Sequence, residues 1–208
     1  EIMVRTASTM LPLGSSLPSF DLPLLGPNWE RKDDSGKALN RMNNHMLSQK
    51  PVLVMILCAH CPFVKHIEEE LTKLDFDFCN DIQMLAVASN CIDTQPDDGP
   101  EFLVQQIQQN GWTFPYLLDS DQKFAKSLMA ACTPDFFFFS ASVKGKNHLI
   151  YRGQMDGSRP GNGIVPSAKD LRAAIEATLN SQLVSKDQKP SIGCNIKWKP
   201  GSEPSWFS

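Results

Sequence analysis

The sequence predicts an α/β domain in which helices flank a central mixed sheet, and three features of the chain indicate that class. The run Val52–Leu57 is apolar without polar alternation, which is typical of a strand buried on both faces. An amphipathic helical pattern follows it closely, from Val64 to Leu74. Later, the aromatic run Asp135–Phe139 predicts one strand of a hairpin, which adds antiparallel strands to the sheet.

The first fifty residues are expected to lead into this sheet. The segment Leu11–Trp29 is rich in Pro, Leu and Gly, and predicts extended chain with a turn at Gly26-Pro27. The segment Ala38–Leu47 predicts a short helix, which Lys50-Pro51 ends. The buried strand then begins.

Beyond the amphipathic helix, strands and helices continue to alternate. The pattern predicts a strand at Ile82–Ala88, a helix from Asp97 to Gln109, a strand at Phe114–Leu118, a helix at Asp121–Met129, the hairpin of Asp135–Phe139 with Leu149–Arg152, and a helix from its N-cap Ser167 to Leu179. No internal repeat is visible. The order predicts one layered domain.

Length and composition fit a single domain with extensions at both ends. The chain has 208 residues, of which 41% are hydrophobic, and this is enough for a sizeable core. We expect residues 1–10 to be a flexible N-terminus in which Glu1 and Ile2 are a cloning remnant, and residues 11–185 to form the domain. Residues 186–208 are expected to be an irregular tail that packs on the domain through aromatic side chains.

Charge and hydropathy exclude several classes of partner. The net charge is -3, and Lys and Arg are scattered rather than gathered into a basic stripe, so we expect no nucleic-acid partner. The most apolar run is too short to span a membrane, so no membrane partner is expected. Because the first residues do not show a basic region followed by an apolar block, we expect a cytoplasmic protein. Its oligomeric state is not predicted.

The six cysteines contain one close pair, Cys58 and Cys61, in the segment Cys58-Ala59-His60-Cys61. This pair lies where a buried strand ends and a helix begins, next to unpaired backbone amides and the positive end of the helix dipole. A thiolate is stabilised there, and the thiolate is the species that attacks disulfides. The placement therefore predicts a redox-active dithiol.

Within the pair, we expect Cys58 to be the more exposed sulfur and the nucleophile, and Cys61 to be the resolving thiol. His60 is expected to contact the substrate and to add positive potential. The same spacing is also half of a zinc site, but a second pair of that kind is missing, so a zinc ion would need distant single ligands. We expect no metal and no cofactor.

Several motifs are shared with a known family: Cys58–Lys65, Ala131–Phe136, Tyr151–Gly153 with Asp156, Ser158–Pro160 and Pro190–Pro200. On these motifs the chain resembles the thioredoxin-like, peroxiredoxin-like proteins of the alkyl hydroperoxide reductase and thiol-specific antioxidant superfamily, common in bacteria including cyanobacteria. The resemblance covers nearly the whole chain. It implies a thioredoxin-like fold, with a redoxin domain at residues 11–185, and a redox role.

The resemblance also predicts a role for the segment Cys132-Thr133-Pro134. From the sequence alone, Pro134 is either an ordinary proline at the start of a strand or a cis proline. The resemblance implies a cis proline that faces the cysteine pair, with Thr133 and Pro134 binding an extended substrate through the backbone. Cys132 is then close enough to be an additional redox thiol. Cys194 is either a second resolving thiol on the tail or a packed small residue.

One departure from the peroxiredoxin pattern bears on the reaction. Peroxiredoxins carry a Pro-x-x-x-Thr-x-x-Cys motif, and when Cys61 is laid on its cysteine, Val54 replaces the proline and Cys58 replaces the threonine. The hydroxyl that activates peroxide is missing, which favours dithiol exchange.

Three functions are compatible with the sequence. The first is a thiol-disulfide oxidoreductase that acts on protein or low-molecular-weight disulfides and receives electrons from a thiol donor. The second is a thiol peroxidase. The third is not an enzyme but a Cu(I)-binding chaperone, because soft thiolates select Cu(I).

Overall fold

The computed structural model describes residues 5–26, 31–32 and 38–207 of the chain. The expected cloning remnant, Glu1 and Ile2, and Pro27 of the expected turn lie outside the described residues. Within the described ranges, none of the helices has both the length and the apolar character needed to cross a bilayer.

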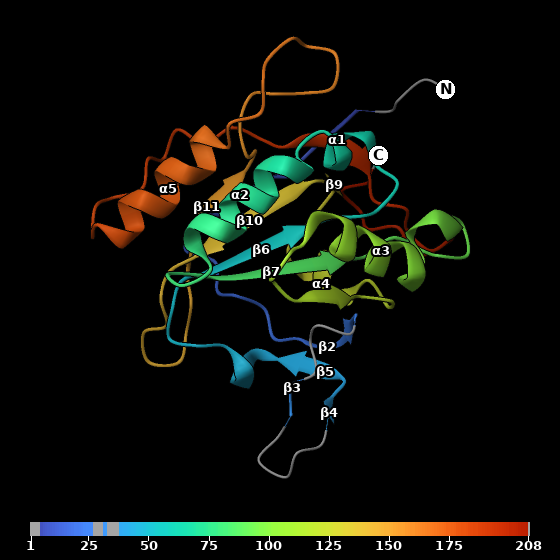
Figure 1. Cartoon of the computed structure of the whole chain (residues 1–208), viewed down its shortest axis with the longest axis horizontal. Coiled ribbons are helices and arrows are strands. Elements are labelled where there is room, and N and C mark those ends of the chain that lie inside the picture. The colour runs from blue at the N-terminus through green and yellow to red at the C-terminus, as the bar shows by residue number, and fades with distance from the viewer. Residues whose placement is uncertain (1–4, 27–30, 33–37, 208) are drawn as a thin grey trace.

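Seven of the described strands form one large mixed sheet, as predicted. Its spatial order is β11 (Leu149–Gly153), β10 (Asp135–Phe139), β6 (Val52–Ile56), β7 (Gln83–Ala88), β8 (Tyr116–Leu118), β2 (Asp21–Leu25) and β5 (Arg41–Asn43). The three central strands β6, β7 and β8 are parallel, whereas β10 runs antiparallel to β6 and forms a hairpin with β11. A separate pair, β3 (Arg31–Lys32) and β4 (Ala38–Leu39), is also antiparallel. Figure 1 shows that the parallel strands β6 and β7 end at the same edge of the sheet. The cysteine pair follows β6 at this edge.

Helices cover both faces of this sheet. They are α1 (Pro62–Lys65), α2 (Glu68–Phe78), α3 (Pro100–Asn110), α4 (Lys123–Ser127) and α5 (Lys169–Leu179), with 3-10 turns η2 (Asn44–Met46) and η3 (Pro96–Asp98). Alternate residues of the buried strands point to two core clusters. Leu53 and Phe138 belong to the cluster that includes α2, α3 and α5, whereas Val54 and Phe137 belong to the cluster that includes α4. The aromatic run of β10 thus contributes side chains to both layers, because successive residues of a strand point to opposite faces of the sheet.

The C-terminal tail differs from the irregular segment expected from the sequence. Residues Ile192–Asn195 form β12, which lies between β1 (Thr6–Ala7) and β9 (Cys132–Thr133) in a three-stranded antiparallel sheet. Figure 1 shows this red segment beside α1 and β9. Ile196 and Trp198, which follow β12, are buried in the second core cluster. The tail is therefore part of the folded body and reaches the neighbourhood of the cysteine pair.

The helix expected at Ala38–Leu47 is wrong. The segment forms β4, β5 and the turn η2 instead, because asparagine side chains bond the backbone in ways that compete with a helix. The Asn43 side chain accepts a hydrogen bond from the His45 amide at 3.0 Å. The Asn44 side chain accepts another from the Phe20 amide at 2.6 Å, which ties the turn to the chain before β2.

Two helix boundaries also differ from the prediction. The helix after the cysteine pair divides into α1 and α2 at Ile67, whose φ of -111° is not helical. The N-cap residue of the last helix is Ala168 rather than Ser167, and the Asp156 carboxylate holds the chain just before the helix by accepting the amides of Ser167 and Ala168, each at 2.7 Å. Ala168 has a positive φ of 53° and precedes Lys169, the first residue of α5.

Candidate active site

The cysteine pair occupies the short connection between β6 and α1, as the sequence predicts. Cys61 is the N-cap residue of α1, and Pro62 is its first helical residue. Both cysteines are fully buried, so the structure does not show the more exposed Cys58 that the sequence suggested. The connection is held by Asp98, whose Oδ1 accepts the amides of Ala59 and His60 at 2.8 and 3.0 Å.

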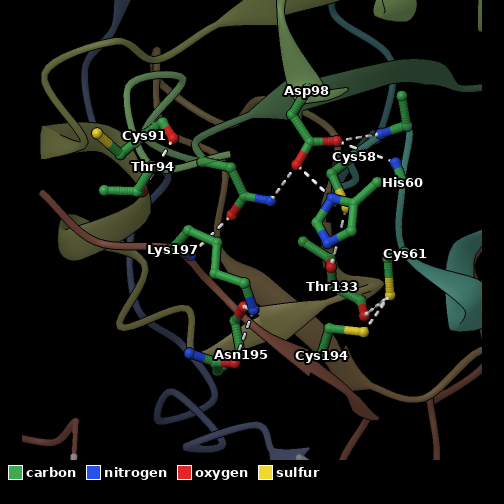
Figure 2. A network of polar contacts seen from close by, with 12 residues as sticks. Cys58, His60, Cys61, Cys91, Thr94, Asp98, Thr133, Cys194, Asn195 and Lys197 are labelled. Carbon is green, nitrogen blue, oxygen red and sulfur yellow. Dashed lines mark hydrogen bonds and ion pairs between the residues drawn. The ribbon is translucent and has the colours of Figure 1, made fainter. Parts of the chain in front are cut away.

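Three thiols meet at this connection, because the tail brings Cys194 to the pair (Figure 2). The Sγ of Cys61 lies 2.8 Å from the Sγ of Cys194 and 3.3 Å from the carbonyl oxygen of Thr133. The Sγ of Cys58 lies 3.3 Å from the Thr133 hydroxyl oxygen. All six cysteines are free thiols, and Cys194 is only half-buried. Of the three clustered thiols, Cys194 is the one nearest to solvent.

The surroundings separate the acidities of the three thiols. Hydrogen bonds from Cys194 and Cys58 hold the pKa of Cys61 well below its usual value, against the opposing effect of burial. Burial raises the pKa of Cys58, and the hydrogen bond to Cys61 and the charge of Asp98 act in the same direction. The hydrogen bond to Cys61, followed by burial, raises the pKa of Cys194. The arrangement therefore favours the thiolate on Cys61.

A polar network lies on the other side of Cys58. The ring Nδ1 of His60 is 2.5 Å from Asp98 Oδ2, which also accepts the Asn90 side-chain amide at 2.7 Å. Burial raises the pKa of Asp98, but the hydrogen bonds from His60 and Asn90 outweigh it, so the net shift is downward. The Gln106 side chain donates to the Cys58 carbonyl at 3.2 Å. Asp98 is thus a buried carboxylate that positions both the loop and the His60 ring.

Sequence reasoning missed the role of Asp98 and Asn90. It placed Asp98 at the start of the helix expected from Asp97 to Gln109. Its partners in the loop lie almost forty residues earlier in the chain, and no spacing rule connects them. The only signal was general: a parallel sheet brings the ends of β6 and β7 to the same edge, and Asn90 closely follows β7.

The described residues contain one group of three potential metal ligands, Cys58, His60 and Asp98, with ligand atoms within 4.8 Å of one another. The Asp98 oxygens already accept four hydrogen bonds, from two amides, His60 and Asn90. The group also offers a single sulfur, whereas Cu(I) selects several soft ligands. Its composition fits a cysteine, histidine and carboxylate relay for protons better than a copper site.

The structure brings the predicted Thr133 and Pro134 to the thiols, with a cis peptide bond between them as the resemblance implies. However, the Thr133 backbone is not free for a partner chain, because Thr133 pairs with Cys194 of the protein's own β12. Cys132 is buried, and its Sγ lies 3.7 Å from the Pro134 carbonyl oxygen. The additional thiol in contact with Cys61 is therefore Cys194 and not Cys132.

Two solved structures resemble nearly the whole chain. An uncharacterized conserved protein from Geobacillus kaustophilus is 39% identical, with a TM-score of 0.83, over 96% of this chain and 98% of that one. A hypothetical protein from Sinorhizobium meliloti 1021 is 36% identical, with a TM-score of 0.82, over 94% of this chain and 100% of that one. The comparison with curated proteins found no match.

More distant solved structures show the fold. Mycobacterium tuberculosis AhpC is 17% identical, with a TM-score of 0.56, over 86% of this chain and 99% of that one. A putative thioredoxin from Neisseria meningitidis is 21% identical, with a TM-score of 0.54, over 79% of this chain and 89% of that one. The fold is therefore thioredoxin-like, as the resemblance implied. The model of the AhpC/TSA family matches residues 13–150, which include the cysteine pair and Pro134. The chain belongs to the AhpC/TSA family.

Proposed function

We propose that the protein is a thiol-disulfide oxidoreductase that uses Cys61 and Cys58 as its dithiol and acts on low-molecular-weight disulfides. One observation carries the proposal: the Sγ of Cys61 lies beside the cis Pro134 loop and 2.8 Å from the Sγ of Cys194, and its hydrogen bonds with Cys194 and Cys58 lower its pKa. Such a sulfur is a ready nucleophile that has a resolving thiol already in contact. The family supports a redox role.

In the first step, the Cys61 thiolate attacks one sulfur of the substrate disulfide. A bond forms between Cys61 and that sulfur, the substrate disulfide breaks, and the other half leaves and takes up a proton to become a free thiol. The lowered pKa of Cys61 favours this step, because the thiolate is the attacking species. We assign the attack to Cys61 rather than to Cys58, because burial raises the pKa of Cys58.

In the second step, Cys58 resolves the mixed disulfide. Its sulfur attacks the Sγ of Cys61, the Cys58–Cys61 disulfide forms, and the second substrate thiol leaves. Cys58 must first lose a proton, and a ring nitrogen of His60 lies within 4.8 Å of its Sγ. We assign the proton on Nδ1 of His60 to the hydrogen bond with the Asp98 carboxylate, and the other ring nitrogen as the base that accepts the Cys58 proton. His60 then returns that proton to the departing thiol, so the two steps convert two protein thiols and one disulfide into one protein disulfide and two small thiols.

The geometry favours small disulfides over protein disulfides. Cys58 and Cys61 are fully buried, and β12 occupies the backbone edge of Thr133. A protein substrate would have to displace β12 to pair with that edge, whereas a small disulfide does not use the backbone edge. A small thiol is the matching electron donor.

A second candidate function, thiol peroxidase, is favoured by the lowered pKa of Cys61 within this family. In that reaction the Cys61 thiolate attacks the peroxide, takes one oxygen as a sulfenic acid, and releases water or an alcohol. Cys58 then condenses with the sulfenic acid and releases water. The position of the activating threonine hydroxyl is taken by Cys58, which makes this the second candidate.

The test is turnover with bis(2-hydroxyethyl) disulfide as substrate and glutathione as donor, measured with coupled glutathione reductase. We expect the wild type to accelerate the exchange, Cys61→Ser to abolish it, and Cys79→Ser, at an exposed cysteine, to leave it unchanged. No acceleration by the wild type overturns the proposal. If the protein consumes hydrogen peroxide with the same donor but does not turn over the disulfide, the result supports the second candidate function, thiol peroxidase.

A further inference from the structure

The contact between Cys61 and Cys194 is closer than packing of two thiols requires. Their Sγ atoms are 2.8 Å apart, although the residues are separated by 133 positions in the sequence. Two sulfur atoms in ordinary van der Waals contact lie well beyond that distance, and a disulfide bond is about 2.05 Å long. Only a small movement separates this pair from a bond.

Backbone pairing of the tail fixes the position of Cys194. β12 pairs with β9 on one side, where Cys194 is opposite Thr133, and with β1 on the other, where Gly193 is opposite Thr6. Gly193 permits this close approach, since a Cβ at this position would lie 2.0 Å from the Thr133 carbonyl oxygen. Cys194 therefore reaches Cys61 because the backbone of the tail is pressed against the loop before Pro134.

The tail also fills the place of an extended partner. The Thr133 edge beside the thiols is paired with β12, and Cys194 presents its sulfur to Cys61 from that strand. Cys194 is also half-buried, whereas Cys58 is fully buried.

We propose that Cys194 is a third redox thiol, and that Cys61 exchanges between a buried disulfide with Cys58 and a more exposed disulfide with Cys194. This rests on the proposed function of Cys61 and adds the route of its re-reduction. Starting from the Cys58–Cys61 disulfide, the Cys194 sulfur attacks Cys61, a Cys61–Cys194 bond forms, and Cys58 leaves and takes up the proton that Cys194 loses. The exchange involves no net oxidation.

A small thiol then reduces the exposed disulfide. Its thiolate attacks the Sγ of Cys194, the Cys61 thiolate leaves, and a mixed disulfide remains on Cys194. A second small thiol attacks the small-molecule sulfur of that mixed disulfide, which releases the donor as its own disulfide and restores the Cys194 thiol. A stabilised leaving thiolate speeds the first attack, and the Cys58 thiol, which is free at this stage, still lowers the pKa of Cys61 through its hydrogen bond.

The experiment maps the disulfides. Reduced wild type, Cys58→Ser and Cys194→Ser proteins are each treated with one equivalent of glutathione disulfide, quenched in acid, alkylated, digested and analysed by mass spectrometry. We expect both disulfides in the wild type, only Cys61–Cys194 in Cys58→Ser, and only Cys58–Cys61 in Cys194→Ser. Cys79→Ser should give the wild-type pattern.

A second measurement keeps the inference testable when a cysteine variant misfolds. Oxidised wild-type protein is reduced by glutathione, and the rate is compared with that of Gly193→Ala, which keeps all three thiols but moves β12 away. We expect a rate lower by about tenfold, because the exposed disulfide forms less often. An equal rate in the two proteins, or Cys194 found alkylated in oxidised Cys58→Ser, overturns the inference.

The two proposals fail differently. Turnover by the wild type with Cys194 always alkylated would retain the proposed function and reject the third thiol. A Cys61–Cys194 disulfide in a protein that shows no turnover would retain the third thiol and reject the proposed function.

Discussion

At the scale of single residues, Cys61 connects the chemistry to the fold. It is the N-cap residue of a helix only four residues long, so the helix dipole expected from the sequence is short. The neighbouring thiols Cys194 and Cys58 contribute more to its lowered pKa than the helix does. Charge on this sulfur therefore depends on a contact between two distant parts of the chain.

Removing the largest of these contacts should be visible by titration. In Cys194→Ala the strongest hydrogen bond to Cys61 is lost, so the pKa of Cys61 rises and its thiolate forms at higher pH. The ultraviolet absorbance of the thiolate, followed against pH, measures this shift. Cys79→Ala should leave the Cys61 midpoint in place, and an unchanged midpoint in Cys194→Ala would contradict the assignment.

Asp98 should act through His60 on the resolving step. Asp98→Asn keeps a similar shape but no longer fixes the proton on His60 Nδ1, so loss of the Cys58 proton slows by about 10²-fold, the lower range for general base catalysis. Rapid quenching should then show a mixed disulfide that accumulates on Cys61. The matched control is Asp97→Asn, at an exposed neighbour. A resolving rate equal to that of the wild type would remove Asp98 from the mechanism.

The sequence predicted this site in part. The position of Cys58 and Cys61 after a buried strand followed from local periodicity, and Pro134 was located through the resemblance. The lowered pKa of Cys61 depends on Cys194, which arrives from the tail. The contact between Cys194 and Cys61 could not be predicted from the sequence, because it depends on the register in which β12 pairs with β9.

At the scale of elements, the small sheet β1, β12 and β9 is the part of the fold that the sequence did not predict. Each of its strands has two to four residues, too few to give an alternation pattern. Its strands come from both ends and the middle of the chain, so only tertiary contacts bring them together. The long elements β6, β7, β10, α2 and α3 were predictable, because each has enough residues to show its period.

Gly193 should be the sensitive position in this sheet. Gly193→Ala places a methyl group 2.0 Å from the Thr133 carbonyl oxygen, so β12 must shift, and we expect a loss of about 1–3 kcal/mol in the free energy of unfolding. Gly157→Ala is a matched control, since a Cβ there meets nothing within 4 Å. Denaturant unfolding of both variants measures the difference. Equal stabilities would show that β12 does not press on the loop.

At the scale of the whole molecule, the tail joins the active site to the second core cluster. Trp198 is 5% exposed and packs in the cluster that contains the α4 side of the sheet. The Lys197 amide donates to the Asn90 side chain at 2.8 Å, and Asn90 in turn bonds Asp98. The tail therefore contributes to stability and to the site together.

Truncating the aromatic anchor should test the first of these contributions. Trp198→Ala removes a large buried side chain, and we expect a loss of about 3–5 kcal/mol in the free energy of unfolding. Leu183→Ala, at a side chain that is almost fully exposed, should change stability by less than about 0.5 kcal/mol. Chemical denaturation compares the two. Similar small losses would mean that the tail is not part of the core.

Cys61 should form a reversible intramolecular disulfide. The direct measurement is the thiol state of Cys61 after equilibration of the wild-type protein in glutathione buffers of increasing oxidising strength, followed by alkylation and peptide mass spectrometry. We predict one reversible two-electron transition in which Cys61 pairs with Cys58 or Cys194, while Cys79 remains open to alkylation throughout. A Cys61 that can be alkylated over the whole range, or that is oxidised only irreversibly to sulfinic or sulfonic acid, would contradict the proposed dithiol chemistry.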